Sequence, residues 1–427
     1  MSGMRVVVIG NGIAGFSAAS TIRRLNEQCD VTMVAKETTP LYSACVLPDY
    51  IAGKITREHT FVKTAQDYHQ LGIGTHFGVE VKEINPPGRT VTLEDGRFLS
   101  YDKLIFATGS DAIVFGERKE GVFKLKTLND ADNILEHKGN RAVVIGAGAI
   151  GIEMAIALHA QGYAVTIVEM MDQILPLALD QRGADKVRGM LEESGIVVFN
   201  QERAIRTLGG ERVVGLATDK RELGCDTLIW AVGMLPRVEL ARLADITIGQ
   251  TGGIRVDAHM ETSASGIYAC GDCVESSDIL TGESYLNLFW HNANRQGSVA
   301  ARNCIGQATT YRGSQNIVNV DVFGNQVAGF GFTEEALHRF QNIPALRGKL
   351  ADLSIIEHEQ NGSYYRLVIL GDRCMGGQFI NVTRDIGMLW AIMVKGTSIA
   401  GLLEMFANDA LMARRPWFGR IRPFFED

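Results

Sequence analysis

Hydrophobic residues near the start of the chain come in short continuous runs separated by glycine-rich turns. Val6 to Ile9 is an unbroken β-branched run, which is typical of a buried parallel strand. The turn GNGIAG follows, and the pattern then predicts a helix from about Ile13 to Leu25 and a second strand in CDVTMVAK. The order predicts a strand–turn–helix–strand unit.

The same unit recurs 136 residues later. RAVVIG predicts a strand, GAGAIG a turn, the stretch through His159 a helix, and AVTIVE the next strand. Each copy is followed by a further strand that ends in small residues, KLIFATGS in the first and TLIWAVGM in the second. Two copies of one such unit predict an α/β protein with two Rossmann-like nucleotide sites.

The pattern changes after about Tyr311. Before that point, GIYACGDCVE predicts a strand end, and NLFWHNANRQGSVAARN predicts a helix. Beyond it, NIVNVDVFGNQVAGFGF and SYYRLVILGDRCMGGQFIN predict antiparallel hairpins, the second turning near Gly371 and Asp372. A helix is predicted from about Arg384 to Val394, so we expect a C-terminal α+β domain.

Composition narrows the class of protein. A chain of 427 residues predicts two or three domains. The 42 basic and 49 acidic side chains give a net charge of −7, which argues against nucleic-acid binding. The apolar stretch from Ala142 to Ala160 is interrupted by glycines and a charge, so no membrane span is predicted. Seven scattered cysteines and no visible signal peptide predict reduced thiols and a cytoplasmic location.

Both turns have the glycine spacing of a dinucleotide-binding loop. The first glycine permits the turn from strand to helix, the second lets the backbone approach a pyrophosphate, and the third lets the helix pack close to the strand. The phosphates then face free N–H groups at the helix N-terminus. The expected nucleotide contacts are Gly10, Asn11, Gly12, Ala14 and Gly15 in the first loop, and Gly146, Gly148, Ala149, Ile150 and Gly151 in the second.

The second strands of the two copies end differently. Glu169 ends VTIVE, 23 residues after Gly146, where a carboxylate accepts hydrogen bonds from ribose hydroxyls and repels a 2′-phosphate. The second site is therefore predicted to bind NAD(H) rather than NADP(H). The matching position in the first copy is Ala35, followed by Lys36 and Glu37, so the usual acid is missing or displaced by two residues. Lys36 and Glu37 are the cofactor-binding residues expected at this strand end.

The ordered motifs resemble those of the pyridine nucleotide-disulfide oxidoreductase family. They are VVVIGNGIAG, ATGS, VVIGAGAIGIE, AVGMLP and GIYACGDC, in the family's order, and the resemblance extends from residue 4 to about 400. It implies FAD and NAD(H) as cofactors, with the NAD domain inserted in the FAD domain. The implied divisions are residues 1–115 and 241–312 for the FAD-binding domain, 116–240 for the NAD-binding domain, and 313–427 for a C-terminal interface domain.

The resemblance implies roles for five residues around FAD. Asp272, preceded by Gly271, would bind the ribityl chain, and Thr108 and Gly109 would line the flavin site. Val81, in GVEVKEI, would meet the adenine through its backbone.

The resemblance also implies how nicotinamide and flavin are positioned. Glu153, in GIE, would lie near the nicotinamide as a positioning residue, and Gly233, in AVGMLP, is a further cofactor contact. The helix after Asn287 would point its N-terminus at the flavin pyrimidine, where its dipole stabilises negative charge on the reduced ring. Hydride transfer then needs mainly orientation and exclusion of water.

Cys45, in YSACVLPDYIAG, is the candidate catalytic thiol. Similar segments occur in the single-cysteine members of the family, the coenzyme A disulfide reductases and NADH oxidases, where the thiol lies beside the flavin. A helix N-terminus next to the flavin would lower its pKa and favour the thiolate. Its usual partners are missing, because Ile13 replaces the loop histidine of the oxidases and no C-terminal APP segment with tyrosine is found.

Cys270 and Cys273 form a CxxC pair, which invites a comparison with thioredoxin-like redox motifs. The pair flanks Asp272 at the predicted flavin site, and two further zinc ligands at matching spacing are missing from the sequence. We therefore expect neither a redox pair nor a metal site there.

Three functions remain open on sequence grounds. The favoured one is a flavin subunit that transfers electrons between NAD(H) and an iron–sulfur partner. Within this class the chain resembles the FAD subunits of multi-subunit 2-oxoacid dehydrogenases of the NADH-dependent phenylglyoxylate type. The first alternative is a free-standing NADH-dependent coenzyme A disulfide reductase or NADH oxidase, a homodimer that uses Cys45. The second is a non-enzymatic flavoprotein that senses NADH.

The C-terminal tail RRPWFGRIRPFFED is a candidate contact surface for a partner protein. It combines Trp417, Phe418, Phe424 and Phe425 with four arginines, a composition common at interface hot spots. The alternative is a strand or turn packed on its own C-terminal domain.

Overall fold

The computed structural model describes residues 3–382 and 386–400. Its first domain is built on a five-stranded parallel sheet with strand order β19-β7-β1-β2-β3. Because β19 lies far along the chain from the other four strands, two separate stretches of sequence build this sheet. The strands are β1 (Arg5–Ile9), β2 (Asp30–Ala35), β3 (Ile73–Phe77), β7 (Lys103–Phe106) and β19 (Ile267–Ala269).

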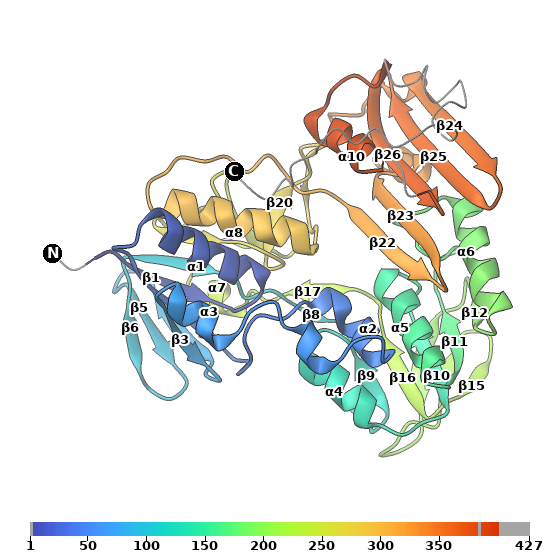
Figure 1. Cartoon of the computed structure of the whole chain (residues 1–427), viewed down its shortest axis with the longest axis horizontal. Coiled ribbons are helices and arrows are strands. Elements are labelled where there is room, and N and C mark those ends of the chain that lie inside the picture. Colours follow the sequence, from blue (N-terminus) through green and yellow to red (C-terminus); the bar gives the residue numbers. More distant parts are fainter. Residues whose placement is uncertain (1–2, 383–385, 401–427) are drawn as a thin grey trace.

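Two helices pack side by side on this sheet, α1 (Ile13–Leu25) and α8 (Trp290–Cys304) (Figure 1). The predicted bounds of α1 are confirmed. A Cβ added to Gly297 of α8 would lie 2.2 Å from the carbonyl oxygen of Ala14 in α1, so only glycine permits this separation. The remaining elements of this domain are α3 (Ala65–Gln70), β4 (Val81–Asn85), β5 (Thr90–Leu93), β6 (Phe98–Ser100), α7 (Glu239–Leu243), β18 (Ile254–Arg255), β20 (Val274–Ser277) and β21 (Ser284–Tyr285). The short helix α2 (Leu47–Ile51) comes from the same stretch of sequence but packs on the helices of the second domain.

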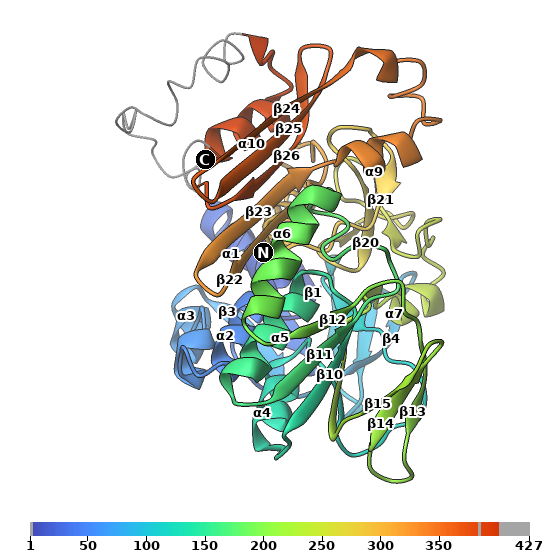
Figure 2. The same cartoon turned by 90° about the vertical axis from the view of Figure 1, so that its right-hand side faces the viewer.

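The second copy of the unit forms its own parallel sheet, with strand order β12-β11-β10-β16-β9 (Figure 1). Figure 2 shows β12, β11 and β10 of this sheet from the side. The repeat expected from the sequence is thus confirmed. The strands and helices of this domain are β9 (Val122–Lys124), α4 (Leu128–Glu136), β10 (Arg141–Ile145), α5 (Ala149–Ala160), β11 (Ala164–Val168), α6 (Gln181–Glu193), β12 (Val197–Phe199) and β16 (Thr227–Trp230). A small antiparallel sheet of β13 (Ala204–Leu208), β14 (Gly215–Thr218) and β15 (Glu222–Gly224) completes it.

A pair of connecting strands joins the two domains. β8 (Ser110–Ala112) leaves the first domain and β17 (Met234–Pro236) returns to it, and the two pair antiparallel. The amide of Arg237 donates to the carbonyl of Gly109 at 2.9 Å and extends the pairing. This pairing brings together the two small-residue turns, ATGS and AVGM, that follow the two copies of the unit.

The C-terminal domain is an antiparallel five-stranded sheet with order β22-β23-β26-β25-β24. The two predicted hairpins are confirmed, with Gly371 and Asp372 between β25 and β26, whereas β24 was not expected. The elements are β22 (Ile317–Val322), β23 (Asn325–Gly331), α9 (Glu334–Arg339), β24 (Leu353–Gln360), β25 (Ser363–Leu370), β26 (Arg373–Ile380) and α10 (Ile386–Lys395). The aromatic and basic tail at 414–427 lies outside the described residues.

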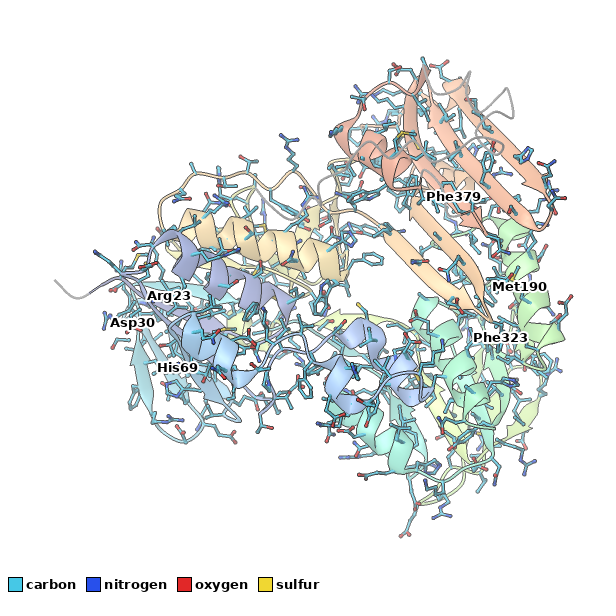
Figure 3. The ribbon with its side chains drawn as sticks, viewed as in Figure 1. Arg23, Asp30, His69, Met190, Phe323 and Phe379 are labelled. Carbon is cyan, nitrogen blue, oxygen red and sulfur yellow. The ribbon has the colours of Figure 1, made fainter. Side chains whose placement is uncertain are left out.

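The C-terminal domain shares a hydrophobic core with the second domain. Val320, Val322 and Tyr364 belong to the same buried cluster as α5 and β11. Phe323, at the tip of the β22–β23 hairpin, lies against that domain, with its ring 5.6 Å from that of His159 (Figure 3). The C-terminal sheet is therefore packed on the second glycine-loop domain.

Two kinds of feature do not occur among the described residues. None of the helices at 3–382 and 386–400 has the length and apolar character to span a bilayer. The same residues contain no group of histidine, cysteine, aspartate and glutamate side chains suited to a metal ion.

Candidate functional site

One cavity of about 1890 Å³ extends between the two glycine-loop domains. Both glycine loops, the β8–β17 connection, the N-terminus of α8 and the first residues of β22 line it. Every site residue predicted from the sequence lines this cavity except Gly15 and Gly151. The structure thus brings the predicted site residues together around a single space large enough for two dinucleotides.

The first loop has the geometry expected of a pyrophosphate cradle. A Cβ on Gly10, whose φ is +113°, would lie 2.0 Å from the carbonyl oxygen of Ala107. A Cβ on Gly15 would lie 2.1 Å from the carbonyl oxygen of Gly10, so Gly15 serves helix packing rather than the cavity. Around Gly12 the space within 4 Å is open. The N-terminus of α1 has no side-chain cap, which leaves its N–H groups for a ligand.

The second loop repeats this geometry. A Cβ on Gly151 would lie 2.0 Å from the carbonyl oxygen of Gly146, and the space around Gly148 is open. Gly148 is the N-cap of α5, so no side chain caps this helix. Ala149 and Ile150 form the first turn of that helix and line the cavity.

Glu169 ties the second loop to the end of β11. Its carboxylate accepts from the amide of Ala147 at 2.6 Å and from the amide of Met171 at 2.8 Å. The side chain is only 8% exposed, yet it lines the cavity. A carboxylate fixed at this point can accept from ribose hydroxyls, as the sequence predicts.

The matching end of β2 is different. Ala35 is buried there, and the two charged residues that follow it have partners on the protein. Lys36 pairs with Glu80 at 2.9 Å, and Glu37 accepts from the hydroxyl of Tyr42 at 2.7 Å. Both charged residues line the cavity, and neither occupies the strand-end position that Glu169 has in the second copy.

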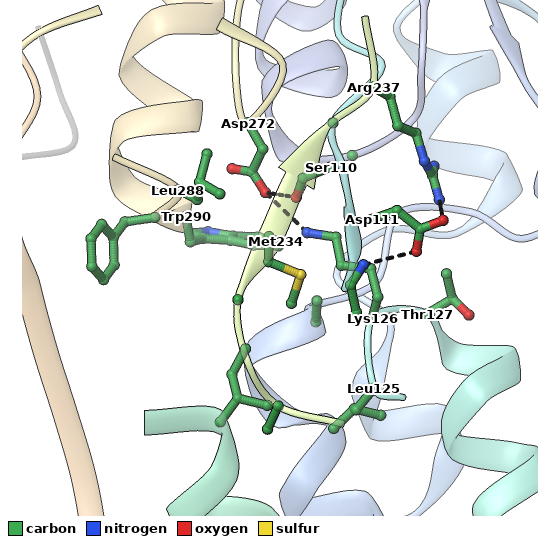
Figure 4. Close-up of a pocket in the computed structure, with 18 of the residues that line it drawn as sticks. Ser110, Asp111, Leu125, Lys126, Thr127, Met234, Arg237, Asp272, Leu288 and Trp290 are labelled. Carbon is green, nitrogen blue, oxygen red and sulfur yellow. Dashed lines mark hydrogen bonds and ion pairs between the residues drawn. The ribbon is translucent and has the colours of Figure 1, made fainter. Parts of the chain in front are cut away.

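Asp272 lies at the centre of a small polar cluster that sequence reasoning missed (Figure 4). Its carboxylate accepts from the hydroxyl of Ser110 at 2.8 Å and from the ammonium of Lys126 at 2.9 Å. The amide of Gly271 donates to the side chain of Gln296 at 2.8 Å, which fixes the turn before it. Lys126 follows a strand of the inserted domain, and no sequence pattern marked it.

The β8–β17 connection supplies a second ion-pair group beside this cluster. Asp111 pairs with Lys124, and the guanidinium of Arg237 lies 3.6 Å from the Asp111 carboxylate (Figure 4). The hydroxyl of Thr108 donates to the carbonyl of Arg237 at 2.7 Å. These bonds fix the glycine turn at Gly109 against the returning strand.

Other predicted residues line the same cavity from the sides. Val81 lies at the start of β4, and Gly233, with φ +112°, lies at the turn before β17. Leu288 and Trp290 lie where α8 begins, so the N-terminus of this helix opens on the cavity as expected (Figure 4). Trp230, with Phe115 packed edge-on at 5.4 Å between ring centroids, was not foreseen.

Cys45 lines the cavity and its side chain is exposed to it. A helix N-terminus beside the flavin was expected to lower the pKa of this thiol, but the protein groups around Cys45 shift the pKa in the opposite direction. The pKa is raised, first because the walls of the cavity withdraw the thiol from water and then because the charge of Glu153 opposes ionisation. Ser43 and Lys126 act in the opposite direction without reversing the shift.

Glu153, on α5, is the second titratable group of this region. Burial raises its pKa from 4.5 to about 7, and the charge of Asp49 adds to the shift. Lys54 lowers the pKa by a smaller amount. A group near its titration point at neutral pH can orient a ligand in either protonation state.

The remaining cysteines are buried. Cys270 and Cys273 are 0% exposed, and the Cys273 thiol donates to the carbonyl of Cys270 at 3.3 Å. Burial raises the pKa of both thiols. Both cysteines of this CxxC are therefore part of the buried core of the first domain.

FAD and NAD(H) fit the chain's own residues. The two open glycine positions leave room for a pyrophosphate at each uncapped helix N-terminus. Asp272 and Glu169 offer carboxylates at the cavity wall for ribityl and ribose hydroxyls. FAD, when bound, would accept a hydride from the nicotinamide and pass the electrons on.

Comparisons with known proteins agree with this geometry. A family model described as pyridine nucleotide-disulphide oxidoreductase matches residues 4–297. The chain is 34% identical to the NADH oxidase of Methanocaldococcus jannaschii, with 97% of each chain covered. It is 30% identical to the ferredoxin–NAD(+) reductase component of a 3-phenylpropionate/cinnamic acid dioxygenase from Photorhabdus laumondii, covering 77% of this chain and 86% of the relative.

A solved structure extends the comparison to three dimensions. The NAD-dependent persulfide reductase from A. fulgidus superimposes with a TM-score of 0.85 at 30% identity. The superposition covers 94% of this chain and 79% of that one. The relatives therefore include proteins named as an NADH oxidase, a persulfide reductase and a ferredoxin–NAD(+) reductase component.

Proposed function

The chain belongs to the pyridine nucleotide-disulphide oxidoreductase family, and from this premise we propose that it passes electrons from NADH through FAD to an iron–sulfur protein. The family makes it an FAD-dependent NAD(H) oxidoreductase. What is proposed is the assignment of sites, the preference for NADH and the nature of the acceptor. In this assignment the first glycine loop and Asp272 bind FAD, and the second loop and Glu169 bind NADH.

The choice of an iron–sulfur protein as the electron acceptor rests on the surroundings of Cys45. Cys45 is the exposed thiol of the chain, and the protein groups around it raise its pKa. A raised pKa lowers the fraction of thiolate, which is the nucleophilic form of cysteine, and the other six cysteines are buried. Electron transfer to a separate protein does not require this thiol.

The finer assignment is to the flavin subunit of a multi-subunit 2-oxoacid dehydrogenase of the phenylglyoxylate type. It rests on the sequence resemblance described above. The ferredoxin–NAD(+) reductase relative supports an iron–sulfur partner in general. Native mass measurement on extracts of the source cell tests the assignment. Co-purification with iron–sulfur and thiamine-binding chains supports it, and a bare homodimer contradicts it.

A second function is favoured by one feature of the site. Cys45 faces the cavity near Glu153, where a disulfide or persulfide substrate could reach it. In this alternative the protein is a free-standing NADH-dependent thiol–disulfide reductase or NADH oxidase, and Cys45 is its nucleophile.

The substitution Cys45→Ser separates the two functions. If the acceptor is an iron–sulfur protein, the holoenzyme keeps most of its NADH-driven reduction of a ferredoxin or an artificial dye. If Cys45 is the nucleophile, turnover with coenzyme A disulfide or polysulfide is lost while dye reduction survives. The buried Cys304→Ser serves as a matched control for thiol removal.

A further inference from the structure

A ten-residue segment runs between the second dinucleotide loop and the C-terminal sheet. It comprises residues 170–179 and is called here the strap. One face of the strap lines the cavity through Met170, Leu175, Pro176, Leu177 and Ala178. Leu177 is 61% exposed. The strap is therefore part of the wall against which NADH would lie.

The strap is fixed to the glycine loop on the cavity side. The amide of Leu175 donates to the carbonyl of Ala147 at 2.8 Å, and Glu169 accepts from the amides of Ala147 and Met171. Leu175 has a φ of +48°, a left-handed conformation that a leucine adopts only where its surroundings impose it. A shift of the strap would thus move the loop as well.

The opposite face of the strap touches the C-terminal domain backbone to backbone. A Cβ added to Gly329 of β23 would lie 2.4 Å from the carbonyl oxygen of Ala178. The side-chain amide of Asn316, just before β22, donates to the carbonyl of Leu177 at 3.0 Å. The C-terminal sheet therefore touches the strap directly behind the cavity wall.

The end of the strap is locked by Asp180, which is 3% exposed and caps α6 through the amide of Gly183 at 2.9 Å. The other partners of its side chain come from the C-terminal sheet. The Tyr364 hydroxyl donates to its carboxylate at 3.1 Å, and the Arg366 guanidinium lies 3.2 Å away. The amide of Asp180 itself donates to the side chain of Gln378 at 2.6 Å.

We propose that the C-terminal sheet sets the position of the strap, and through it the affinity for NAD(H), with Gly329 and Asp180 as positioning residues. The proposal rests on the proposed assignment of the second glycine loop to NADH. Neither residue lines the cavity, so neither would touch the nucleotide. The inference also gives the C-terminal domain a part in nucleotide binding, since anything that displaces its sheet would change the affinity for NAD(H).

The substitution Gly329→Ala tests the proposal without touching the cavity. The added methyl would lie 2.4 Å from the Ala178 carbonyl oxygen, so the strap and β23 must separate by several tenths of an ångström. We expect the Kd of the FAD-loaded protein for NAD⁺ and for ADP-ribose to rise about fivefold or more, with KM for NADH rising and kcat at saturation largely kept. Gly189→Ala on α6, where an added Cβ meets no atom within 4 Å, is the matched control.

A second variant covers the case in which Gly329→Ala does not fold. Tyr364→Phe removes one hydroxyl from Asp180 and leaves the packing of the ring in place. We expect faster hydrogen exchange in residues 170–179 and a weaker Kd for ADP-ribose. A lower melting temperature with an unchanged Kd would mean a purely structural role and would overturn the inference. A wild-type protein that binds neither probe would instead refute the NADH assignment.

Discussion

Lys126 and Asp272 form an ion pair across 146 residues of chain, with Nζ and Oδ2 2.9 Å apart. Lys126 belongs to the inserted domain and Asp272 to the turn after β19 of the first domain. Both side chains are about one-fifth exposed, at 23% and 18%. The pair therefore links the two domains at the edge of the cavity, where Ser110 supplies a further hydrogen bond.

Removal of the Lys126 ammonium should lower both the free energy of unfolding and the amount of bound FAD. In Lys126→Met the Asp272 carboxylate loses its cation in a partly buried site, so we expect the free energy of unfolding to fall by about 1–2 kcal/mol. FAD content after purification should fall as well, because the carboxylate is no longer held in place. Urea denaturation and the flavin-to-protein absorbance ratio measure the two effects. The exposed Lys220→Met is the control, and equal behaviour of the two variants would show that the pair contributes nothing.

The pKa of Glu153 gives a prediction for the pH dependence of stability. Its pKa in the folded protein is about 7, above the ordinary value of 4.5. The unfolded chain loses this proton near pH 4.5 while the folded protein keeps it, so the contribution of Glu153 to stability declines as pH rises from about 4.5 to 7.

In the variant Glu153→Gln the side chain cannot ionise, so the decline of stability with rising pH should disappear. Between pH 4.5 and pH 8 the variant should gain about 2–3 kcal/mol relative to the unsubstituted protein, measured by denaturant unfolding of the flavin-loaded form. At pH 8 the substitution also removes a charge that raises the pKa of Cys45, so iodoacetamide should alkylate that thiol faster. A difference in stability that does not vary with pH would contradict the assigned shift.

The sequence predicted the parts of the site that depend on local backbone geometry. Gly10, Gly146 and the helices that follow them were foreseen because a strand–glycine–helix turn is encoded within a few residues. Lys126 was missed because its partner is distant in sequence and a lone lysine after a strand has no signature. The raised pKa of Cys45 was missed for a related reason, because it comes first from the cavity walls that withdraw the thiol from water and then from Glu153, on a helix more than 100 residues away.

The contact between Gly329 and Ala178 shows the same limit within the fold. The two hairpins of the C-terminal domain follow from alternating hydrophobic residues and their turn glycines. Which glycine of β23 meets the strap depends on how two separate domains dock, and periodicity contains no information on that. The sequence could therefore predict the domains but not their packing.

The carboxylate of Glu169 should decide the choice of nicotinamide nucleotide. We expect the unsubstituted protein to use NADH with a kcat/KM at least tenfold above that for NADPH, because a fixed negative charge repels a 2′-phosphate. Glu169→Gln should lower the KM for NADPH and raise that for NADH. Steady-state assays with a dye acceptor measure both constants.

Glu202 offers the matched control for that prediction. It is also buried and lines the same cavity, but Arg221 lies 3.2 Å from its carboxylate and the Thr218 hydroxyl donates to it. Since its charge is already compensated, Glu202→Gln should change the ratio of the two kcat/KM values less than Glu169→Gln. An unsubstituted protein that prefers NADPH would refute the role given to Glu169.

Two glycines at the start of α5 have different roles. Gly148 leaves room for a ligand, and Gly151 lets the helix pack close to the strand before it. A Cβ on Gly148 meets no atom within 4 Å, and the backbone there has φ −71°, which alanine adopts readily. Gly148→Ala should therefore keep the fold and the bound FAD while the Kd for NAD⁺ rises about tenfold or more, because the methyl occupies the space that the pyrophosphate needs. Calorimetric titration of the flavin-loaded protein with NAD⁺ gives this constant.

Gly151→Ala should behave in the opposite way. Its Cβ would lie 2.0 Å from the carbonyl oxygen of Gly146, so α5 must move away from β10 and the domain should lose several kcal/mol of stability. Thermal unfolding of the two variants in parallel distinguishes the roles. If Gly148→Ala destabilised the fold as much as Gly151→Ala, or bound NAD⁺ as well as the unsubstituted protein, the second loop would be a packing turn and NADH would have to bind elsewhere.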